Sequence, residues 1–446
     1  MFIPRTHSTG RLLLWFALAS AASLTGCASS SNCVHRGAGD APMTAPEFPE
    51  VERGQIAPDL SALESIEVLP VPSTMAPATA AYRSLTHANC QCLAALMSPG
   101  GNQIAGEKNA VQAQGTEDPE ELACMTWLRR SLLDYAEVGA RDQSAAQALS
   151  RYYRLARIEH RLDVMHESIV QTRQAQETLD KLIDRGLEAV TDDGTLLRQY
   201  WELESQREEA DLERRELNVL LRHDLAVDPM EGPWLFWPDT PLAVDPAPID
   251  VETAIATGLS QRAELGLLRV LLAHLTPETL PVARATLGSA NALLGLQPPT
   301  ACGACIAQLL HCGTCDSCAE VAEVAARRRQ LQQQLADREQ AVISEVRQAA
   351  AESEARLAQV LYAREALASW QRRVAELEER IATGDATFLD VSAARLEILR
   401  AKDQLVTAVV GWHLAQVQLS YAQGLLAAEC GFGPHAAYGH GSHAGH

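Results

Sequence analysis

The sequence predicts an all-α protein in which a hairpin of two long antiparallel helices occurs twice. Two stretches, 121–185 and 320–381, are rich in Ala, Leu, Glu, Gln and Arg, contain no proline, and are each followed by a glycine-containing break. Apolar residues make up 47% of the chain, enough for a sizeable core, whereas aromatic residues make up 5%. The formal charge of −20 argues against a nucleic-acid partner, because such proteins carry a basic stripe.

The first 26 residues have the pattern of an export signal. Arg5 and Arg11 precede an apolar run, 12–22, that is too short to span a bilayer. The following Leu-Thr-Gly-Cys sequence, which ends at Cys27, resembles the lipobox of bacterial lipoproteins. The resemblance implies a cleaved signal peptide (1–26), a covalent lipid such as palmitate on Cys27 and, with Ala28 next, an outer-membrane anchor with the body in the periplasm. The alternative is an ordinary signal peptide with an incidental cysteine.

Residues 27–80 are rich in Ser, Ala, Pro and Gly without periodicity, so we expect a flexible tether from the lipidated cysteine. The first helical repeat is assigned to 81–249. Its long helix should run from about residue 121 to 185, and its return helix from about 195 to 223. Seven prolines or glycines between 229 and 248 predict an irregular crossing segment after it.

The second repeat is assigned to 250–428 and has the same order. We expect a modest helical stretch over 250–275, a Gly-, Pro- and Cys-rich segment over 277–318, a long helix over 320–381 and a return helix over 387–426. A repeated order of this kind indicates an internal duplication. Met97–Asn102, with Pro99 and two glycines, is expected to be a turn.

Apolar residues on the long helices alternate by threes and fours, which is the spacing of a coiled-coil seam. At 1.5 Å per residue each long helix should measure roughly 95 Å. Helices of that length bridge a distance or build a tube. The seam residues on the second long helix include Leu367, Trp370, Val374, Leu377 and Ile381.

The turn that follows the second long helix resembles that of TolC-type outer-membrane efflux proteins. The matching residues are Gly384, Leu389, Asp390 and Val391. The first turn matches more loosely, through Gly186 and Leu187, and the segment 261–265 resembles the family's opening of the second repeat, with Ala263 where the family has proline. The resemblance covers about residues 80–428.

The resemblance implies a homotrimer whose helices form a periplasmic tunnel, and a role in a tripartite pump with a periplasmic adaptor and an inner-membrane transporter. It implies that the turn residues above form adaptor-contact tips. It also implies strands of a membrane β-barrel near 85–120 and 277–318. Those segments lack alternating apolar runs of the roughly 9–11 residues that a spanning strand requires, so we predict that the barrel strands are absent or vestigial.

Cysteines gather ahead of both long helices. Apart from Cys27 there are ten, and the C-x2-C spacing of the second group suits Zn²⁺. An oxidising envelope favours disulfides instead, and redox chemistry is a third alternative. The disulfide candidates are Cys90, Cys92, Cys124, Cys302, Cys305, Cys312, Cys315 and Cys318, with Cys33 and Cys430 completing the ten.

The tail, residues 429–446, is rich in Gly and His and is expected to be disordered. His435, His440, His443 and His446 are weak candidates for Zn, Cu or Ni, against the alternative of a tail with incidental affinity. No cofactor is expected beyond the lipid on Cys27.

Acidic residues at the hairpin turns have two interpretations. In a trimer Asp184, Asp192, Asp193 and Asp385 would form an acidic ring that favours cations at a narrow aperture. Otherwise they are solvated turn residues whose carboxylates meet positive helix ends. The sequence shows no catalytic constellation, so an enzyme is not expected, and His160 and His166 are expected at the surface.

Two functions follow from these observations. The first is a lipid-anchored, TolC-like subunit that forms a trimeric export conduit. The second is a structural coiled-coil lipoprotein that acts as a spacer or scaffold in the envelope and transports nothing.

Overall fold

The computed structural model describes residues 81–113, 121–185, 193–290 except 229, 231 and 233, and 316–433. The signal peptide, Cys27, the tether and the four tail histidines lie outside the described residues. The chain divides into two compact units. One comprises 105–135 and 264–340, and the other comprises 81–104, 136–263 and 341–433 within the described ranges.

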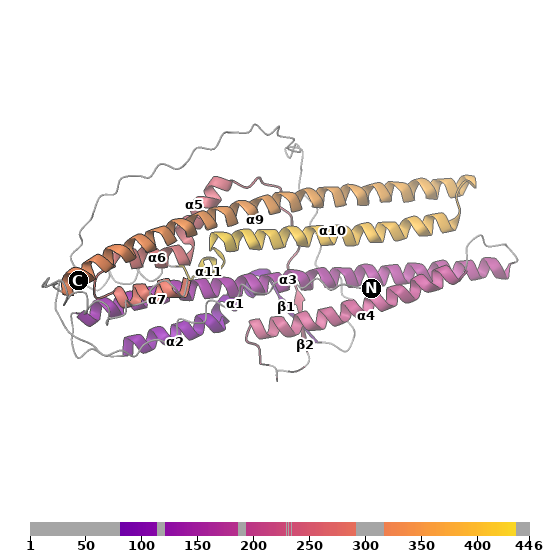
Figure 1. Cartoon of the computed structure of the whole chain (residues 1–446). Helices are drawn as coiled ribbons and strands as arrows, with labels where there is room; N and C mark the ends of the chain where they lie inside the picture. The colour runs from indigo at the N-terminus through magenta and orange to yellow at the C-terminus, as the bar shows by residue number, and fades with distance from the viewer. Residues whose placement is uncertain are drawn as a thin grey trace, which may run out of the picture. The chain divides into compact units, whose positions relative to one another are not determined.

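The element order confirms the expected fold class. Each half has short helices, then a long helix, then a shorter return helix, and the first half also contains a small two-stranded parallel sheet (Figure 1). The elements of the first half are β1 (Ala81–Leu85), α1 (His87–Met97), α2 (Pro99–Ala113), α3 (Glu121–Asp184), α4 (Asp193–Asp224) and β2 (Trp234–Pro238). Those of the second are α5 (Val251–Gln261), α6 (Ala263–Ala273), α7 (Leu280–Ala290), α9 (Asp316–Thr383), α10 (Phe388–Gln423) and α11 (Leu426–Glu429). None of the described helices combines the length and apolarity that a membrane crossing requires.

Three stretches differ from the sequence prediction. Residues 99–102 were expected to be a turn, but they open α2, because proline suits the first helical position and the Ser98 hydroxyl accepts a hydrogen bond from the Gly101 amide at 3.1 Å. The stretch 250–275 is two helices that meet at Arg262. Part of the Gly-, Pro- and Cys-rich segment forms α7.

In the larger unit the long helices form a row in the order α4, α3, α10, α9 (Figure 1). One hydrogen bond from each neighbouring pair fixes this order: Arg173 to Tyr200 at 3.0 Å, Lys402 to Glu167 at 3.0 Å, and Gln416 to Ser353 at 2.7 Å. The inner helices α3 and α10 therefore pack on two sides, and the outer helices α4 and α9 pack on one.

This placement of α3 corrects the expectation for His160. Its side chain is only 8% exposed, because a helix with neighbours on both sides has no broad solvent face. Burial lowers the pKa of His160 to about 4, so the imidazole is neutral at physiological pH. His166, expected at the surface as well, is half-buried.

The α3–α4 contact contains a buried carboxyl group. Glu159 is 3% exposed, its Oε2 lies 3.9 Å from Arg214, and its Oε1 has no hydrogen-bond partner in the described part of the chain. Burial outweighs the attraction of Arg214, with smaller contributions from Asp163 and Asp211, and raises the pKa of Glu159 to about 7.

We expect Glu159→Gln to raise the melting temperature, and to do so more at about pH 8.5 than at about pH 5. The folded protein retains a proton on Glu159 that the unfolded chain has released, so this residue's contribution to stability falls as pH rises from about 4.5 to about 7. Above that range the free energy of unfolding of the Glu159→Gln variant should exceed that of the unaltered protein by about 2–3 kcal/mol. Thermal unfolding at the two pH values measures the gain, and Glu213→Gln at the exposed edge of the same helix pair is the control. An equal gain at both pH values would contradict the assignment.

The Arg262 corner holds the C-terminal end of α10. The guanidinium donates to the carbonyls of Tyr421 and Ala422, both at 3.3 Å, and pairs with Glu345 of α9 at 2.9 Å. Helix α10 ends at Gly424 in the left-handed conformation, with φ of 72°. A Cβ on Gly424 would lie 3.2 Å from the Gln261 carbonyl oxygen, so both the conformation and the close backbone approach require glycine.

The C-terminal residues are tied to α1. Cys92 forms a disulfide with Cys430, the Gln91 side chain donates to the Leu426 carbonyl at 3.0 Å, and the Ala427 amide donates to Asp142 of α3 at 2.9 Å. This end of the larger unit is therefore closed by a covalent bond and by buried hydrogen bonds.

The two-stranded sheet positions the segment that follows it. β1 and β2 pair in parallel with Ala81 opposite Trp234 and Leu85 opposite Pro238. Residues 239–250, which we call the strap, run from β2 to α5 and bury Leu242 and Val244 in the core. The smaller unit has its own core of leucines from α3, α6, α7, α9 and the α6–α7 loop, namely Leu128, Leu268, Leu271, Leu275, Leu287 and Leu331.

Candidate functional site: the α9–α10 tip and the outer helices

Helix α9 ends at Thr383, and Gly384 follows with φ of 81°. The Asp385 amide donates back to the Arg380 carbonyl at 2.9 Å, and the Gly384 amide donates to the Ile381 carbonyl at 3.1 Å. A glycine in this conformation directly after a helix satisfies the last helical carbonyls. Gly384 therefore determines how the chain reverses at the tip.

Helix α10 begins with a capping box. The Thr387 hydroxyl accepts from the Asp390 amide at 3.2 Å, and the Asp390 carboxylate accepts from the Thr387 amide at 2.8 Å. The hydrogen bond from the Thr387 side chain holds the pKa of Asp390 below its usual value. Asp390 therefore stays ionised at the positive end of the helix dipole.

Two further bonds close the turn. The Arg380 guanidinium donates to the Asp385 carbonyl at 3.0 Å, and the Thr383 hydroxyl donates to the Asp385 carboxylate at 2.9 Å. Beneath them Val374, Leu377, Val391 and Ala394 form a small core between the helices. Arg395 and Glu378 pair across the hairpin at 2.6 Å, so the tip is an ordered structure.

The predicted tip residues divide by role. Val391 is 3% exposed and supports the tip from inside, whereas Leu389 is half-buried. The exposed apolar side chains at the tip are Ile381 and Phe388, at 42% and 39%. Phe388 lies in the turn segment that resembles the family, and the sequence predicts that aromatic residues flanking the tip glycines belong to the contact surface.

Only part of the first tip lies in the described chain. Gly186, Leu187 and Asp192 lie outside the described residues, and of Asp193 only the backbone is described. Asp184 is exposed at the end of α3. Asp385 and Asp390 both accept hydrogen bonds from threonines within the turn, as solvated turn residues do. The acidic ring stays a prediction.

The cysteine prediction is wrong for Cys90, which is a free, fully buried thiol. Residues two apart on a helix point in different directions, so Cys92 reaches Cys430 and Cys90 points into the core. Burial raises the pKa of the Cys90 thiol far above its usual value. The other six candidate cysteines have side chains outside the described part of the chain, including Cys124 and Cys318, whose backbones lie in α3 and α9.

The two outer helices of the row each expose an apolar stripe. On α4 the stripe consists of Leu197, Trp201, Leu212 and Val219, which are 51–67% exposed. Their spacing of 4, 11 and 7 residues places them within roughly 60° of one another around the helix. On α9 the stripe consists mainly of small residues around Tyr362, which is 73% exposed: Ala351 and Ala355 are exposed as well, and Ala366 is half-buried.

Exposed apolar residues in register along a helix indicate an interaction face. Large side chains on one edge and small ones on the other suit each other sterically, as in a helix seam where knobs enter holes. The two outer edges of the row therefore carry exposed apolar surface of complementary size.

We expect Gly424→Ala to be more destabilising than Gly384→Ala. Both glycines have positive φ, at 72° and 81°, so both alanine variants carry a conformational cost of about 1–2 kcal/mol. A Cβ at Gly384 meets nothing within 4 Å, whereas at Gly424 it meets the backbone of Gln261 and Arg262. Thermal unfolding of the two variants measures the difference, which we expect to exceed about 1 kcal/mol. Equal destabilisation would contradict the close approach at Arg262.

Solved structures share this architecture, although no family model and no curated protein matches the sequence. The CmeC outer membrane channel of Campylobacter jejuni is 13% identical, with a TM-score of 0.52 over 76% of this chain and 85% of that one. The outer-membrane channel OprN is 14% identical, with a TM-score of 0.55 over 76% and 90%. The open MtrE outer membrane channel of Neisseria gonorrhoeae is 10% identical, with a TM-score of 0.54 over 80% and 95%. The expected TolC-like helical-hairpin fold is thereby confirmed.

Proposed function

We propose that this protein is a subunit of a trimeric export conduit at the outer membrane, lipid-anchored through Cys27 with its helical body in the periplasm. Passive conduction through the tube would be gated by movement of the hairpins. The fold shared with three outer-membrane channels supports the class. The observation that carries the proposal is the pair of exposed stripes on α4 and α9, since a tube needs two complementary edges on every subunit.

The hairpin tips are proposed to contact a periplasmic adaptor of a tripartite pump. At the second tip the ordered turn presents Phe388 and Ile381 beside Arg380 and Asp385. A contact surface with apolar residues at its centre and charged residues at its rim is typical of protein–protein interfaces. The capping box and the small core beneath the turn hold these side chains in place, which reduces the entropy lost on docking.

A specific observation favours a second candidate, a structural spacer in the envelope. The Cys92–Cys430 disulfide and the bonds from α1 to α11 stiffen one end of the larger unit. The segments 85–120 and 277–318 precede the long helices, and most of their described residues form α1, α2 and α7. A stiff helical body is sufficient for a spacer, whereas a conduit must also form an open passage for solutes.

Conductance of the purified lipidated protein in planar bilayers separates the two functions. A conduit should give discrete, reproducible current steps that depend on protein concentration. Trp201→Glu/Leu212→Glu, which disrupts the α4 stripe, should abolish these steps at equal protein mass, whereas the exposed-loop variant Met230→Glu should retain them. Current steps that are absent from the unaltered protein across salt and voltage would reject the conduit and leave the spacer.

A further inference from the structure

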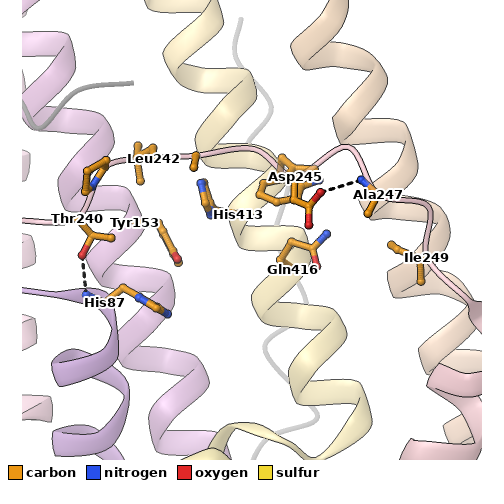
Figure 2. Close-up of a pocket in the computed structure, with 12 residues that line it drawn as sticks. His87, Tyr153, Thr240, Leu242, Asp245, Ala247, Ile249, His413 and Gln416 are labelled. Carbon is orange, nitrogen blue, oxygen red and sulfur yellow. Dashed lines mark hydrogen bonds between the residues drawn. The ribbon is translucent and has the colours of Figure 1, made fainter. Parts of the chain in front are cut away.

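A cavity of about 410 Å³ lies where the strap passes over α3 and α10, within the larger unit. Figure 2 shows His413 of α10 below the strap, between Tyr153 of α3 on one side and Asp245 and Gln416 on the other. The volume of the cavity falls within the range of small-molecule sites, roughly 300–1,000 Å³. A neighbouring copy would meet the outer helices α4 and α9, so the cavity stays accessible in the proposed tube and the inference does not depend on that function.

The floor of the cavity is aromatic. The rings of Tyr153 and His413 stack with centroids 4.8 Å apart at an angle of 15°, and Trp412 meets His413 edge-on at 4.9 Å. Tyr153 and Trp412 are each only 7% exposed, so packing fixes both rings. A rigid aromatic floor of this kind favours a flat, apolar molecule.

One polar atom in the floor has no hydrogen-bond partner. His413 Nε2 is buried, and nothing in the described part of the chain bonds to it. A buried polar atom without a partner carries a cost that a ligand with a matching donor or acceptor would remove. At the left wall of the cavity in Figure 2, the His87 backbone amide donates a hydrogen bond to the Thr240 hydroxyl of the strap at 3.0 Å. This bond holds α1 and the strap together at that wall.

The charge of the lining points to a cation. Burial lowers the pKa of His413 to about 4 and lowers the pKa of His87 as well, so both imidazoles are neutral at physiological pH. Asp245 is then the charged side chain among the described residues of the lining. Its Oδ1 accepts from the Ala247 amide at 3.0 Å, which orients the carboxylate and leaves Oδ2 for a ligand.

Among the described residues no three potential metal ligands converge, so the cation the lining favours is an organic one. We propose that this cavity binds a small aromatic amine, whose ring lies against the Tyr153–His413 pair and whose ammonium group pairs with Asp245. His413 Nε2, which is buried in the unliganded chain, provides the second polar contact once the ring rotates to open it to the cavity.

Calorimetric titration of the full-length protein with tryptamine at neutral pH tests the proposal. Tryptamine should bind saturably with one molecule per chain. Tryptophol has the same indole with a hydroxyl in place of the amine and should bind about fivefold more weakly. The factor is modest because an ammonium group gains little free energy from pairing with the solvent-exposed Asp245 carboxylate. Indole-3-acetate, with the opposite charge, should not bind measurably.

Matched variants localise the site. Asp245→Asn keeps the bond to the Ala247 amide and should weaken tryptamine binding about fivefold without affecting tryptophol. Asp228→Asn is the control, because Asp228 accepts from the amide two residues on in the same way, at 2.8 Å from Met230, and does not line the cavity. His413→Phe keeps the ring stack, removes Nε2 and should weaken binding about fivefold. No saturable tryptamine binding, or equal affinity of the Asp245→Asn and unaltered proteins, would overturn the proposal.

Discussion

Replacing Trp201 and Leu212 by glutamate is expected to convert the proposed trimer into monomers while each chain keeps its helices. Both side chains are more than half exposed, so the substitutions remove nothing from the core of the single chain. At each proposed subunit contact they remove the burial of two apolar side chains, and each such burial contributes about 1.5–3 kcal/mol to the free energy of association. The loss corresponds to a drop in the association constant of roughly 10²- to 10⁴-fold.

Light scattering in detergent measures the mass, and far-UV circular dichroism shows whether the helices persist. Met230→Glu is the matched control, because Met230 is 88% exposed and lies outside both stripes. It should remain trimeric. If the double variant keeps the mass of the unaltered protein, the α4 stripe is not the subunit contact. If Met230→Glu also dissociates, the effect comes from added charge and not from the stripe.

Loss of the Cys92–Cys430 disulfide is expected to produce the largest single effect on stability. The bond joins residues 338 positions apart, so it removes much conformational freedom from the unfolded chain. Cys92→Ser/Cys430→Ser should lower the free energy of unfolding by about 3–5 kcal/mol. The loss should concentrate where α1 meets α11, because the C-terminal residues are then held without a covalent bond, by the burial of Leu426 and Ala427 and by hydrogen bonds such as that from Gln91 to Leu426.

Urea titration of the double variant measures this loss, and hydrogen exchange of α11 localises it. Cys90→Ala is the control, since Cys90 is buried and free and its replacement costs only a small cavity, about 1 kcal/mol. A double variant as stable as the unaltered protein would show that the disulfide adds nothing to the bonds around it.

The long helices could be predicted because their signals are local. Helices α3 and α9 begin and end within a few residues of the expected positions, since proline-free, Ala- and Leu-rich stretches and a turn glycine act within the helix itself. The Thr387–Asp390 capping box is equally local and reads directly from the residue spacing.

Other features depended on contacts between distant residues. The corner at Arg262 carries no proline or glycine, and it forms because the guanidinium reaches the last carbonyls of α10. The burial of His160 follows from the place of α3 between two neighbours, which no pattern within α3 reveals. The sequence likewise could not select Cys430 as the partner of Cys92, or assemble the cavity from α1, α3, α10 and the strap.

The mass of the purified, lipidated protein in detergent tests the central claim most directly. In the proposed conduit the exposed edges of the four-helix row meet other copies of the chain, so we expect a stable species of three chains across a wide range of protein concentration. A species of one chain that persists at high concentration, with the α4 and α9 stripes still open to solvent, would contradict it.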